Sequence, residues 1–263
     1  MSARVCAIVE AGGVPGRNPL LPPLRAELGR AGVELDEWDP TGAFEPTGVL
    51  PEADLYLVKG DHPSVLSAAA CAAAAGGRCL NDLDATITAA DKAAVATRLA
   101  RAGLPVPPTA LVGGRDQLAR ELERGPRFVK PLRGFHGAGA ALLGPGEAER
   151  AAGAGPWLVQ EPVDGDGWDV KAYGCGDRVA LRRMRFEPGR VDGARLPLAP
   201  DPLLEELARA AADACGLDLF GVDVLVGGDG PVVVDVNAFP GYRSVPEAPA
   251  WVAEAVLREL EAA

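Results

Sequence analysis

The chain has 263 residues and a formal net charge of −11, from 26 basic and 37 acidic side chains. This balance argues against nucleic acid as the main partner, because binding a phosphate backbone needs a basic surface. Hydrophobic residues make up 48% of the chain and charged residues 24%, as in ordinary globular proteins.

The chain shows no signal for a membrane or for secretion. No apolar run approaches the length that spans a bilayer, and the first residues lack a basic region leading into an apolar stretch. The five cysteines are odd in number and include no Cys-x-x-Cys pair, which favours free thiols in a reducing compartment. We therefore expect a cytoplasmic protein without a membrane partner.

Residues 1–85 alternate strand-like and helix-like patterns, which predicts a small α/β domain with a parallel sheet. The expected strands are VCAIVE, VELDEWD, DLYLVKG and RCLN, and the expected helices are LPPLRAELGRAG and an alanine-rich segment from Ser64 to Ala75.

The next helix is expected to begin with Thr88 as its N-cap and Asp91 at its third position, and to run to Arg101 before Gly103. The proline-rich LPVPPTALV then forms a stiff connector, so a domain boundary is expected near residues 81–108. We divide the rest of the chain into 86–162 and 163–263.

The second half mixes strands and helices. RFVKPL, AALLG and WLVQEPV read as strands, and WDVKAYGCGDRVALRRMRF reads as a β-hairpin. Asp201 and Pro202 begin a helix that ends at Gly216. A second hairpin, FGVDVLVGGDGPVVVDVN, and an amphipathic helix complete the predicted α+β part.

Lysine is rare in this chain: only four of the 26 basic residues are lysines, namely Lys59, Lys92, Lys130 and Lys171. An ammonium group is a compact charge that suits contact with a phosphate oxygen, whereas arginine presents a wide planar fork. The four lysines are therefore candidates for function. Lys59, followed by Asp61 and His62, would line an acceptor pocket in the N-terminal domain.

The last hairpin carries candidate metal ligands. Asp235 and Asn237 alternate with valines, so they share one face of their strand. A turn with an odd number of residues, such as 228–230, would place Asp223 opposite Asp235 on that face, and a two-residue turn would not. Two carboxylates and an amide suit Mg²⁺. The alternative is a set of solvated edge-strand residues.

A glycine-rich loop follows Lys130, with glycines at Gly134, Gly137 and Gly139. Such loops let backbone N–H groups approach phosphate oxygens. The pattern matches neither the P-loop nor the dinucleotide fingerprint. Lys171 shares a strand face with Asp169. The two residues belong either to a functional site or to an ordinary solvated cross-strand pair.

Four segments, in this order, resemble the ATP-grasp superfamily and together cover nearly the whole chain with residues 1–85. They are NDLDATITAADKAAVATRLARAGLPVPPT, FVKPLRGFHGAGA, LVQEPVDGDGWDVKAYGCGDRVA and GLDLFGVDVLVGGDGPVVVDVNAFPGY. The resemblance implies an ATP-grasp fold, α/β plus α+β, with a Rossmann-like pre-ATP-grasp domain at the N-terminus and ATP between two subdomains.

The resemblance also implies roles for individual residues. Phosphates would be held by Lys92, Lys130 and the loop of Gly134, Gly137 and Gly139, and adenine by Gln160, Glu161 and the backbone of Val163. Asp169 would approach the ribose. Asp223, Asp235 and Asn237 would bind one or two Mg²⁺ ions. Lys171 and Arg182 would lie near the transferred phosphate or the acceptor.

Two departures from the family pattern stand out. Asp235 occupies the main metal position, where a glutamate is usual, and is one methylene shorter. His136 lies at the tip of the glycine-rich loop, where a small or polar residue is expected. It is a surface residue, a phosphate contact or a proton-transfer group.

Three functions are compatible with these residues. The favoured one, similar to RimK-like enzymes, is a carboxylate–amine ligase in which ATP phosphorylates a carboxylate and an amine attacks the acyl phosphate. The alternative resembles inositol polyphosphate kinases, in which a hydroxyl attacks the γ-phosphate. The third is an inactive nucleotide-binding protein. The expected acceptor is a small molecule: a carboxylate and an amine, or a polyol phosphate. A homo-oligomer is possible.

Overall fold

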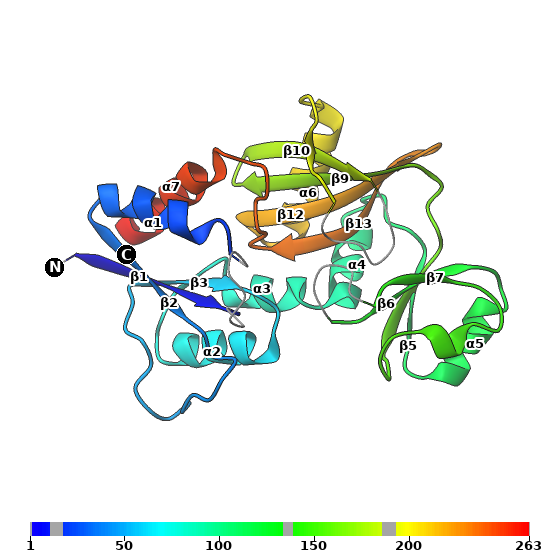
Figure 1. The fold of residues 1–263 in the computed structure, drawn as a ribbon, viewed down its shortest axis with the longest axis horizontal. Helices are drawn as coiled ribbons and strands as arrows, with labels where there is room; N and C mark the ends of the chain where they lie inside the picture. The colour runs from blue at the N-terminus through cyan, green and yellow to red at the C-terminus, as the bar shows by residue number, and fades with distance from the viewer. Residues whose placement is uncertain (1, 11–17, 134–138, 186–192, 263) are drawn as a thin grey trace.

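The structure is a computed structural model that describes residues 2–10, 18–133, 139–185 and 193–262. Its strands form three sheets (Figure 1). In strand order these are β2-β1-β3-β4, then β5-β8-β6-β7, then β11-β10-β9-β12-β13. The expected combination of an N-terminal α/β unit and a following α+β part is confirmed.

The first sheet is parallel and carries helices on both faces. Alternate residues of β1 separate cleanly: Val5, Ala7 and Val9 join the core under α1 and α7, whereas Cys6 and Ile8 join the core under α2. This two-sided burial is typical of parallel sheets. The elements are β1 (Ala3–Val9), α1 (Leu21–Arg30), β2 (Val33–Trp38), β3 (Leu55–Lys59), α2 (Pro63–Ala74), β4 (Cys79–Leu80) and α7 (Ala248–Glu261).

The helix expected from Thr88 to Arg101 is instead two helices, α3 (Leu83–Ala89) and α4 (Lys92–Arg101). The carboxylate of Asp91 accepts hydrogen bonds from the backbone N–H groups of Ala93 and Ala94, so Asp91 is the N-cap of α4. Thr88 lies inside α3, and the prediction of Thr88 as a cap was wrong. A carboxylate is favoured there because its charge also complements the helix dipole.

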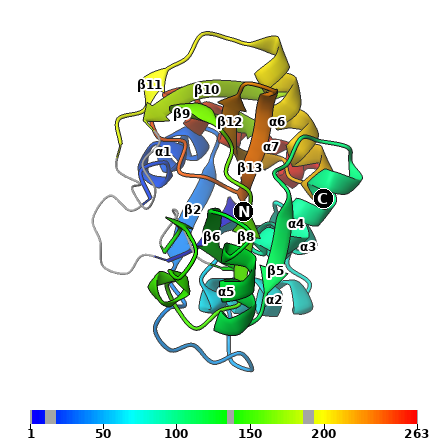
Figure 2. The ribbon, with the colours of Figure 1, turned by 90° about the vertical axis from the view of Figure 1, so that its right-hand side faces the viewer.

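The second sheet is antiparallel and is drawn in green in Figure 2, with α5 against it. Its core contains the fully buried Trp157 and the leucines of α5, Leu118 and Leu122. The sequence analysis did not predict α5. The elements are β5 (Thr109–Val112), α5 (Arg115–Leu122), β6 (Arg127–Pro131), β7 (Ala141–Leu143), the short 3-10 helix η1 (Ala148–Arg150) and β8 (Trp157–Gln160).

The third sheet is also antiparallel, and helix α6 covers one of its faces. Val170, Ala172 and Val222 point into that core. Asp201 caps α6 and Gly216 ends it with φ +72°, as expected from the sequence. The elements are β9 (Gly165–Cys175), β10 (Arg178–Arg185), β11 (Leu196–Pro197), α6 (Pro202–Cys215), β12 (Leu219–Gly227) and β13 (Gly230–Ala238).

A buried asparagine joins the first sheet to the third. The Asn81 side chain donates to the carbonyl of Leu219 at 2.8 Å and accepts from the backbone N–H groups of Asp218 and Leu219. Helices α3 and α4 also pack against the third sheet, through Ala85, Val95 and Leu99. The division of the chain at residues 85 and 162 remains a prediction.

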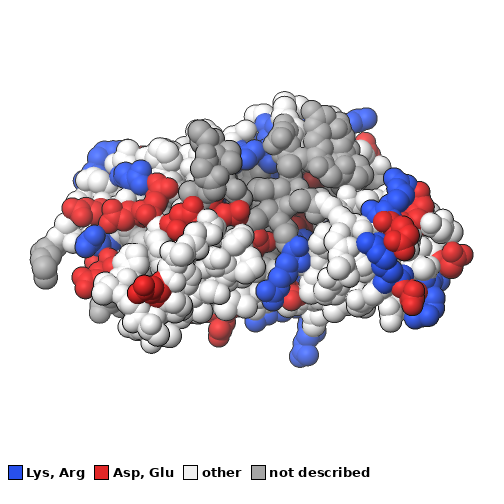
Figure 3. All heavy atoms as spheres, turned by 60° about the horizontal axis from the view of Figure 1, so that its bottom comes forward, with Lys and Arg blue, Asp and Glu red and all other residues white. Residues whose placement is uncertain are grey.

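The negative charge is unevenly spread over the surface. On the face shown in Figure 3, acidic side chains predominate at the end that holds the first sheet, and both signs mix at the end that holds the second sheet. None of the helices in the described ranges has the length and apolarity needed to cross a bilayer.

Candidate functional site

Four charged residues form a row across the third sheet. Arg182 on β10 pairs with Lys171 on β9, Lys171 pairs with Asp223 on β12, and Asp223 pairs with Asp235 on β13. Directly opposite residues of antiparallel strands share a face, so these side chains project from the face that α6 does not cover. We call these four residues the charged row.

The shared face of Asp223 and Asp235 is confirmed, but the reason given for it was wrong. Gly227 pairs with Gly230, so the turn has two residues, which alone would place the two carboxylates on opposite faces. The register shifts between Asp223 and Val224, and Val234 is the extra residue of a β-bulge. The bulge restores the common face.

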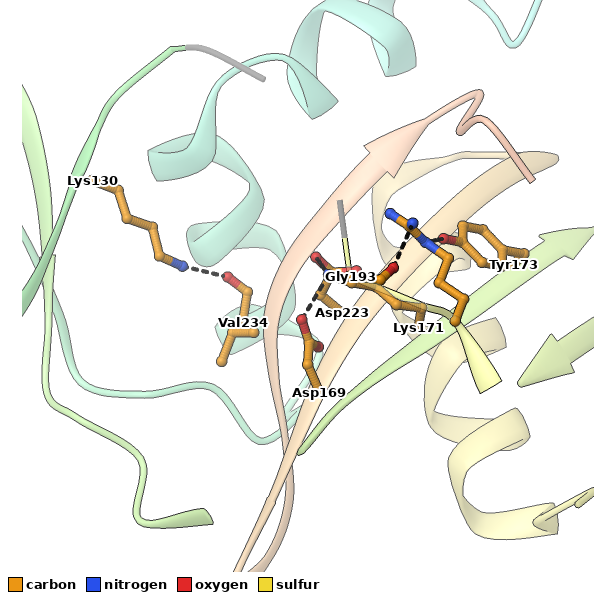
Figure 4. Close-up of polar contacts among 8 residues, drawn as sticks. Lys130, Asp169, Lys171, Tyr173, Gly193, Asp223 and Val234 are labelled. Carbon is orange, nitrogen blue, oxygen red and sulfur yellow. Dashed lines mark hydrogen bonds and ion pairs between the residues drawn. The ribbon is translucent and has the colours of Figure 1, made fainter. Parts of the chain in front are cut away.

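Lys171 lies between two carboxylates (Figure 4). Its Nζ is 2.6 Å from Asp223 and 2.7 Å from Asp169, and all three side chains are largely buried. The sequence-based alternative of a solvated cross-strand pair is therefore wrong. Although burial opposes it, the two carboxylates raise the pKa of Lys171 above its usual value.

One ammonium group cannot neutralise this cluster of carboxylates. Burial, together with the charge of Asp223, raises the pKa of Asp169 to about 7. The Oδ1 atom of Asp169 is buried and has no hydrogen-bond partner. An unpartnered oxygen beside an excess of negative charge is a costly arrangement, which a bound cation would relieve.

Lys130 reaches this cluster from the second sheet. Its Nζ donates to the carbonyl oxygen of Val234, the bulge residue, at 3.0 Å (Figure 4). Burial lowers the pKa of Lys130, while the charges of Asp235, Asp223 and Asp169 oppose that shift and Lys92 adds to it. Lys130 therefore lies within electrostatic reach of Lys92 and of the three carboxylates.

The other side of the cluster carries arginine and tyrosine. Arg195 Nε donates to the Tyr173 hydroxyl at 2.9 Å, and Arg182 Nε donates to the Ser244 carbonyl at 2.6 Å. In Figure 4, Lys130 and Tyr173 lie on opposite sides of Asp169 and Asp223. The site thus has a lysine end and an arginine end.

The sequence analysis missed Tyr173 and Arg195. Tyr173 could have been found, because it lies two residues after Lys171 on the same strand face. Arg195 had no such signal: it is one of many arginines, and only the return of the chain after β10 brings it to Tyr173.

The residues expected to hold adenine lie at and beyond the end of β8, where the chain passes to the third sheet. Gln160 is buried and donates to the Thr109 hydroxyl at 3.1 Å. Glu161 is exposed, and its backbone N–H donates to the Pro108 carbonyl. Val163 is half-buried in the connection to β9. Their contact with a nucleotide remains a prediction.

Part of the glycine-rich loop lies outside the described residues, including Gly134, His136 and Gly137. Gly139 is described and has φ +76°, a conformation that favours glycine. A Cβ atom there would lie 2.8 Å from that of Ala152. Gly139 is therefore required by its backbone and its neighbour, whatever its role toward phosphate.

Lys59 and His62, two of the residues expected to line an acceptor pocket, make different contacts. The Nδ1 atom of His62 accepts a hydrogen bond from the Ser64 N–H and caps α2. Lys59 is buried and donates to the carbonyls of Phe239 and Pro240. Lys59 therefore touches the chain that leaves β13, close to the predicted metal ligands.

The donors of the predicted metal site fit Mg²⁺. Within the described part of the chain, no three His, Cys, Asp or Glu side chains gather closely enough to hold a metal by themselves. The predicted set is two opposed carboxylates, Asp223 and Asp235, with the Asn237 amide next on the same face of β13. These are the hard oxygen donors that Mg²⁺ takes, completed by water or phosphate oxygens.

Known proteins resemble this chain in sequence and in fold. The family model described as the inositol 1,3,4-trisphosphate 5/6-kinase ATP-grasp domain matches residues 156–257. That segment contains β8 to β13 and most of α7, so it includes the whole charged row.

Relatives with curated names include ligases. The chain is 27% identical over 234 residues to probable alpha-L-glutamate ligase 2 of Hahella chejuensis, covering 80% of this chain and 76% of that protein. It is 31% identical over 193 residues to a probable alpha-L-glutamate ligase of Shewanella loihica, covering 66% and 63%. A third match is the ribosomal protein bS6–L-glutamate ligase of Shigella boydii, 31% identical over 186 residues and covering 63% and 61%. The matches to these last two span less than two thirds of the relative's length.

Solved structures show the same fold over almost the whole chain. The RimK domain ATP-grasp protein of Sphaerobacter thermophilus superposes with a TM-score of 0.77 at 23% identity, covering 98% of this chain and 99% of that one. D-cycloserine synthetase DcsG gives 0.76 at 20% identity, covering 98% and 100%. The chain therefore has the ATP-grasp fold, and its sequence is similar to an ATP-grasp domain of inositol phosphate kinases and to alpha-L-glutamate ligases.

Proposed function

We propose that the chain is an ATP- and Mg²⁺-dependent carboxylate–amine ligase that forms an acyl phosphate. The observation that carries this proposal is the charged row, which has the amine of Lys130, from the second sheet, at its acidic end and the guanidinium groups of Arg182 and Arg195 at its basic end. The names of the matched relatives support the ligase class.

The nucleotide would lie at the lysine end, between the second and third sheets. Lys130 and Lys92 would contact its phosphates, and Gln160, Glu161 and Val163 would hold adenine. Asp169 is buried and paired with Lys171 here, and its contact with the ribose stays a prediction.

The divalent ion would be held by Asp223, Asp235 and Asn237. When bound, Mg²⁺ would neutralise phosphate charge and orient the phosphates for in-line transfer. One solved neighbour, the ATP-grasp ligase PsnB, was determined with its minimal precursor, Mg and ADP, and superposes with a TM-score of 0.67 at 19% identity.

The acceptor would lie at the arginine end. A carboxylate oxygen of the acceptor would attack the γ-phosphorus, which forms the acyl phosphate and breaks the bond to ADP. The amine of the second substrate would then attack the acyl carbon, and phosphate would leave as the amine loses a proton. Lys171 and Arg182 would stabilise the negative charge that develops on the transferred phosphoryl group.

The arginine end of the site and the names of relatives together support a class of acceptor. Arg182 and Arg195 provide planar guanidinium donors, which suit a carboxylate. The names of relatives include ligases of glutamate and of a ribosomal protein, and PsnB was solved with a precursor peptide. We propose an amino acid or a peptide carboxylate as the acceptor.

A kinase remains the second candidate, because the matching family model is that of an inositol phosphate kinase domain. The product separates the two functions. Incubation with ATP, Mg²⁺, L-glutamate or a glutamate-ended peptide, and hydroxylamine should give a hydroxamate, since hydroxylamine traps an acyl phosphate. An acid-stable phosphoester formed from inositol phosphates, without hydroxamate from the acids, would replace the ligase with the kinase.

A further inference from the structure

Lys59 connects the first sheet to the segment that follows β13. It is the last residue of β3 and only 8% exposed, and 180 residues separate it from Phe239. Its Nζ donates to the carbonyl oxygens of Phe239 at 3.1 Å and Pro240 at 3.0 Å. The same nitrogen lies 4.7 Å from the centre of the Phe239 ring. The amine is thus enclosed by one short segment.

That segment, residues 239–244, has an unusual backbone, and we call it the β13 loop. Phe239, Tyr242 and Ser244 have φ values of 51°, 46° and 65°, in the left-handed region that bulky side chains avoid. Such conformations persist only where surrounding contacts impose them, and they are concentrated at functional sites.

The β13 loop is held from three directions. Besides the amine of Lys59, the Tyr242 hydroxyl donates to the Gly174 carbonyl at 2.7 Å, and Arg182 Nε donates to the Ser244 carbonyl at 2.6 Å. Arg182 is the basic end of the charged row. The loop also begins two residues after Asn237, the amide of the predicted Mg²⁺ site.

We propose that Lys59 is a positioning residue of this site: its amine fixes the β13 loop, and the loop in turn fixes Arg182 and Asn237. This inference rests on the proposed function. It makes the first sheet a part of the catalytic apparatus, since a residue of β3 holds the segment that joins the predicted metal ligands to the arginine end.

The burial of an amine here needs a reason. An apolar side chain would fill the same space without the cost of taking a charge out of water. That cost shows in Lys59 itself, because burial, with the nearby charge of Arg243, lowers its pKa to about 7. The carbonyl groups of Phe239 and Pro240 and the ring of Phe239 offset this cost, but only when the β13 loop has its present conformation. The buried amine and the loop conformation therefore depend on each other.

The proposal is tested with Lys59→Met in the full chain, with Lys59→Gln as a milder variant should Lys59→Met fail to fold. Arg78→Met is the matched control. Arg78, just before β4 of the first sheet, also donates a hydrogen bond to a distant backbone carbonyl, that of Glu259 in α7. Amide hydrogen exchange of residues 239–244 is measured together with ADP release from Mg²⁺-ATP without an added acceptor.

The expected result is faster exchange in residues 239–244 and a kcat for ADP release about tenfold lower, with KM for ATP changed by less than about twofold. Arg78→Met should leave both unchanged. Lys59 variants that match Arg78→Met in both measurements would overturn the proposal. A wild-type chain that fails to bind Mg²⁺-ATP in calorimetry would overturn the proposed function, while the exchange measurement would still decide whether Lys59 fixes the loop.

Discussion

Asp223 and Asp235 lie directly opposite each other although the turn between their strands has only two residues. The extra residue of the bulge, Val234, brings them to one face, and its carbonyl oxygen accepts the hydrogen bond from Lys130. A single irregularity of β13 therefore pairs the predicted metal ligands and also provides the contact with the second sheet.

Asp235→Asn is expected to abolish Mg²⁺-dependent turnover while the chain still folds. The side chain is half-buried and the amide is nearly the same size, so packing is preserved while a charged ligand is lost. ADP release should fall by about a hundredfold or more. Asp229→Asn, in the exposed turn of the same hairpin, is the control and should retain activity. Full activity of Asp235→Asn would refute the metal assignment.

Lys130→Arg is expected to weaken nucleotide binding despite the conserved charge. The buried Lys130 amine is a compact donor that contacts the Val234 carbonyl through one nitrogen. A planar guanidinium group is wider and needs a different arrangement of acceptors. Calorimetric titration with AMPPNP and Mg²⁺ should show an affinity at least about tenfold lower. Arg120→Lys, at an exposed position of α5 beside the same sheet, is the control and should leave the affinity unchanged. Unchanged affinity of Lys130→Arg would contradict a phosphate contact.

Arg195→Ala is expected to raise KM for the acceptor about tenfold while KM for ATP stays within about twofold. Arg195 lies at the arginine end, where Tyr173 orients its guanidinium group. The matched control is Arg183→Ala, an exposed arginine on β10 whose side chain alternates to the face opposite Arg182. The check is ADP release with the acceptor varied at saturating ATP. Equal effects of both substitutions would remove Arg195 from the acceptor site.

The stability of the chain is expected to rise with pH above neutrality because of Lys59. Its folded-state pKa is about 7, against an ordinary value of 10.5. Between these two values the unfolded chain binds more protons than the folded chain, so the free energy of unfolding increases with pH, by about 5 kcal/mol at most. Urea unfolding between pH 6.5 and 10 measures this slope. Lys59→Met should flatten it, and an unaltered slope would assign the effect to other groups.

Asn81→Ala is expected to lower the free energy of unfolding by about 3 kcal/mol, because it removes the partner of two buried backbone groups of Leu219 and of the partly buried N–H of Asp218. Chemical denaturation gives the value. A loss below about 1 kcal/mol would be no larger than that of an ordinary surface substitution. It would mean that water replaces the Asn81 side chain between the first and third sheets.

The sequence predicted the order of elements well where a local pattern carried the information. The parallel N-terminal sheet follows from alternating apolar runs, and α6 follows from Asp201, Pro202 and Gly216. The Asp91 cap was misassigned because Thr88 offers the same chemistry three residues earlier, and only packing decides between them.

The site was predicted less completely, because much of it depends on contacts distant in sequence. Asp235 and Asn237 became candidates from the pattern of their own strand, and the lysines became candidates because lysine is rare in this chain. The bulge at Val234 has no clear local signature, so the shared face of Asp223 and Asp235 was correct for a wrong reason. Arg195 could be recognised only from its hydrogen bond to Tyr173 in the folded chain. In the same way, the hydrogen bonds of Lys59 to the carbonyls of Phe239 and Pro240 appear only in the structure.

The hydrogen bond between Lys130 and Val234 has a consequence for nucleotide binding. The ammonium group has three N–H donors, and the carbonyl of Val234 occupies one of them. A phosphate oxygen can therefore be bound without loss of that carbonyl. A nucleotide held by Lys130 would then be joined through one side chain both to β6 and to the bulge of β13 beside Asp235.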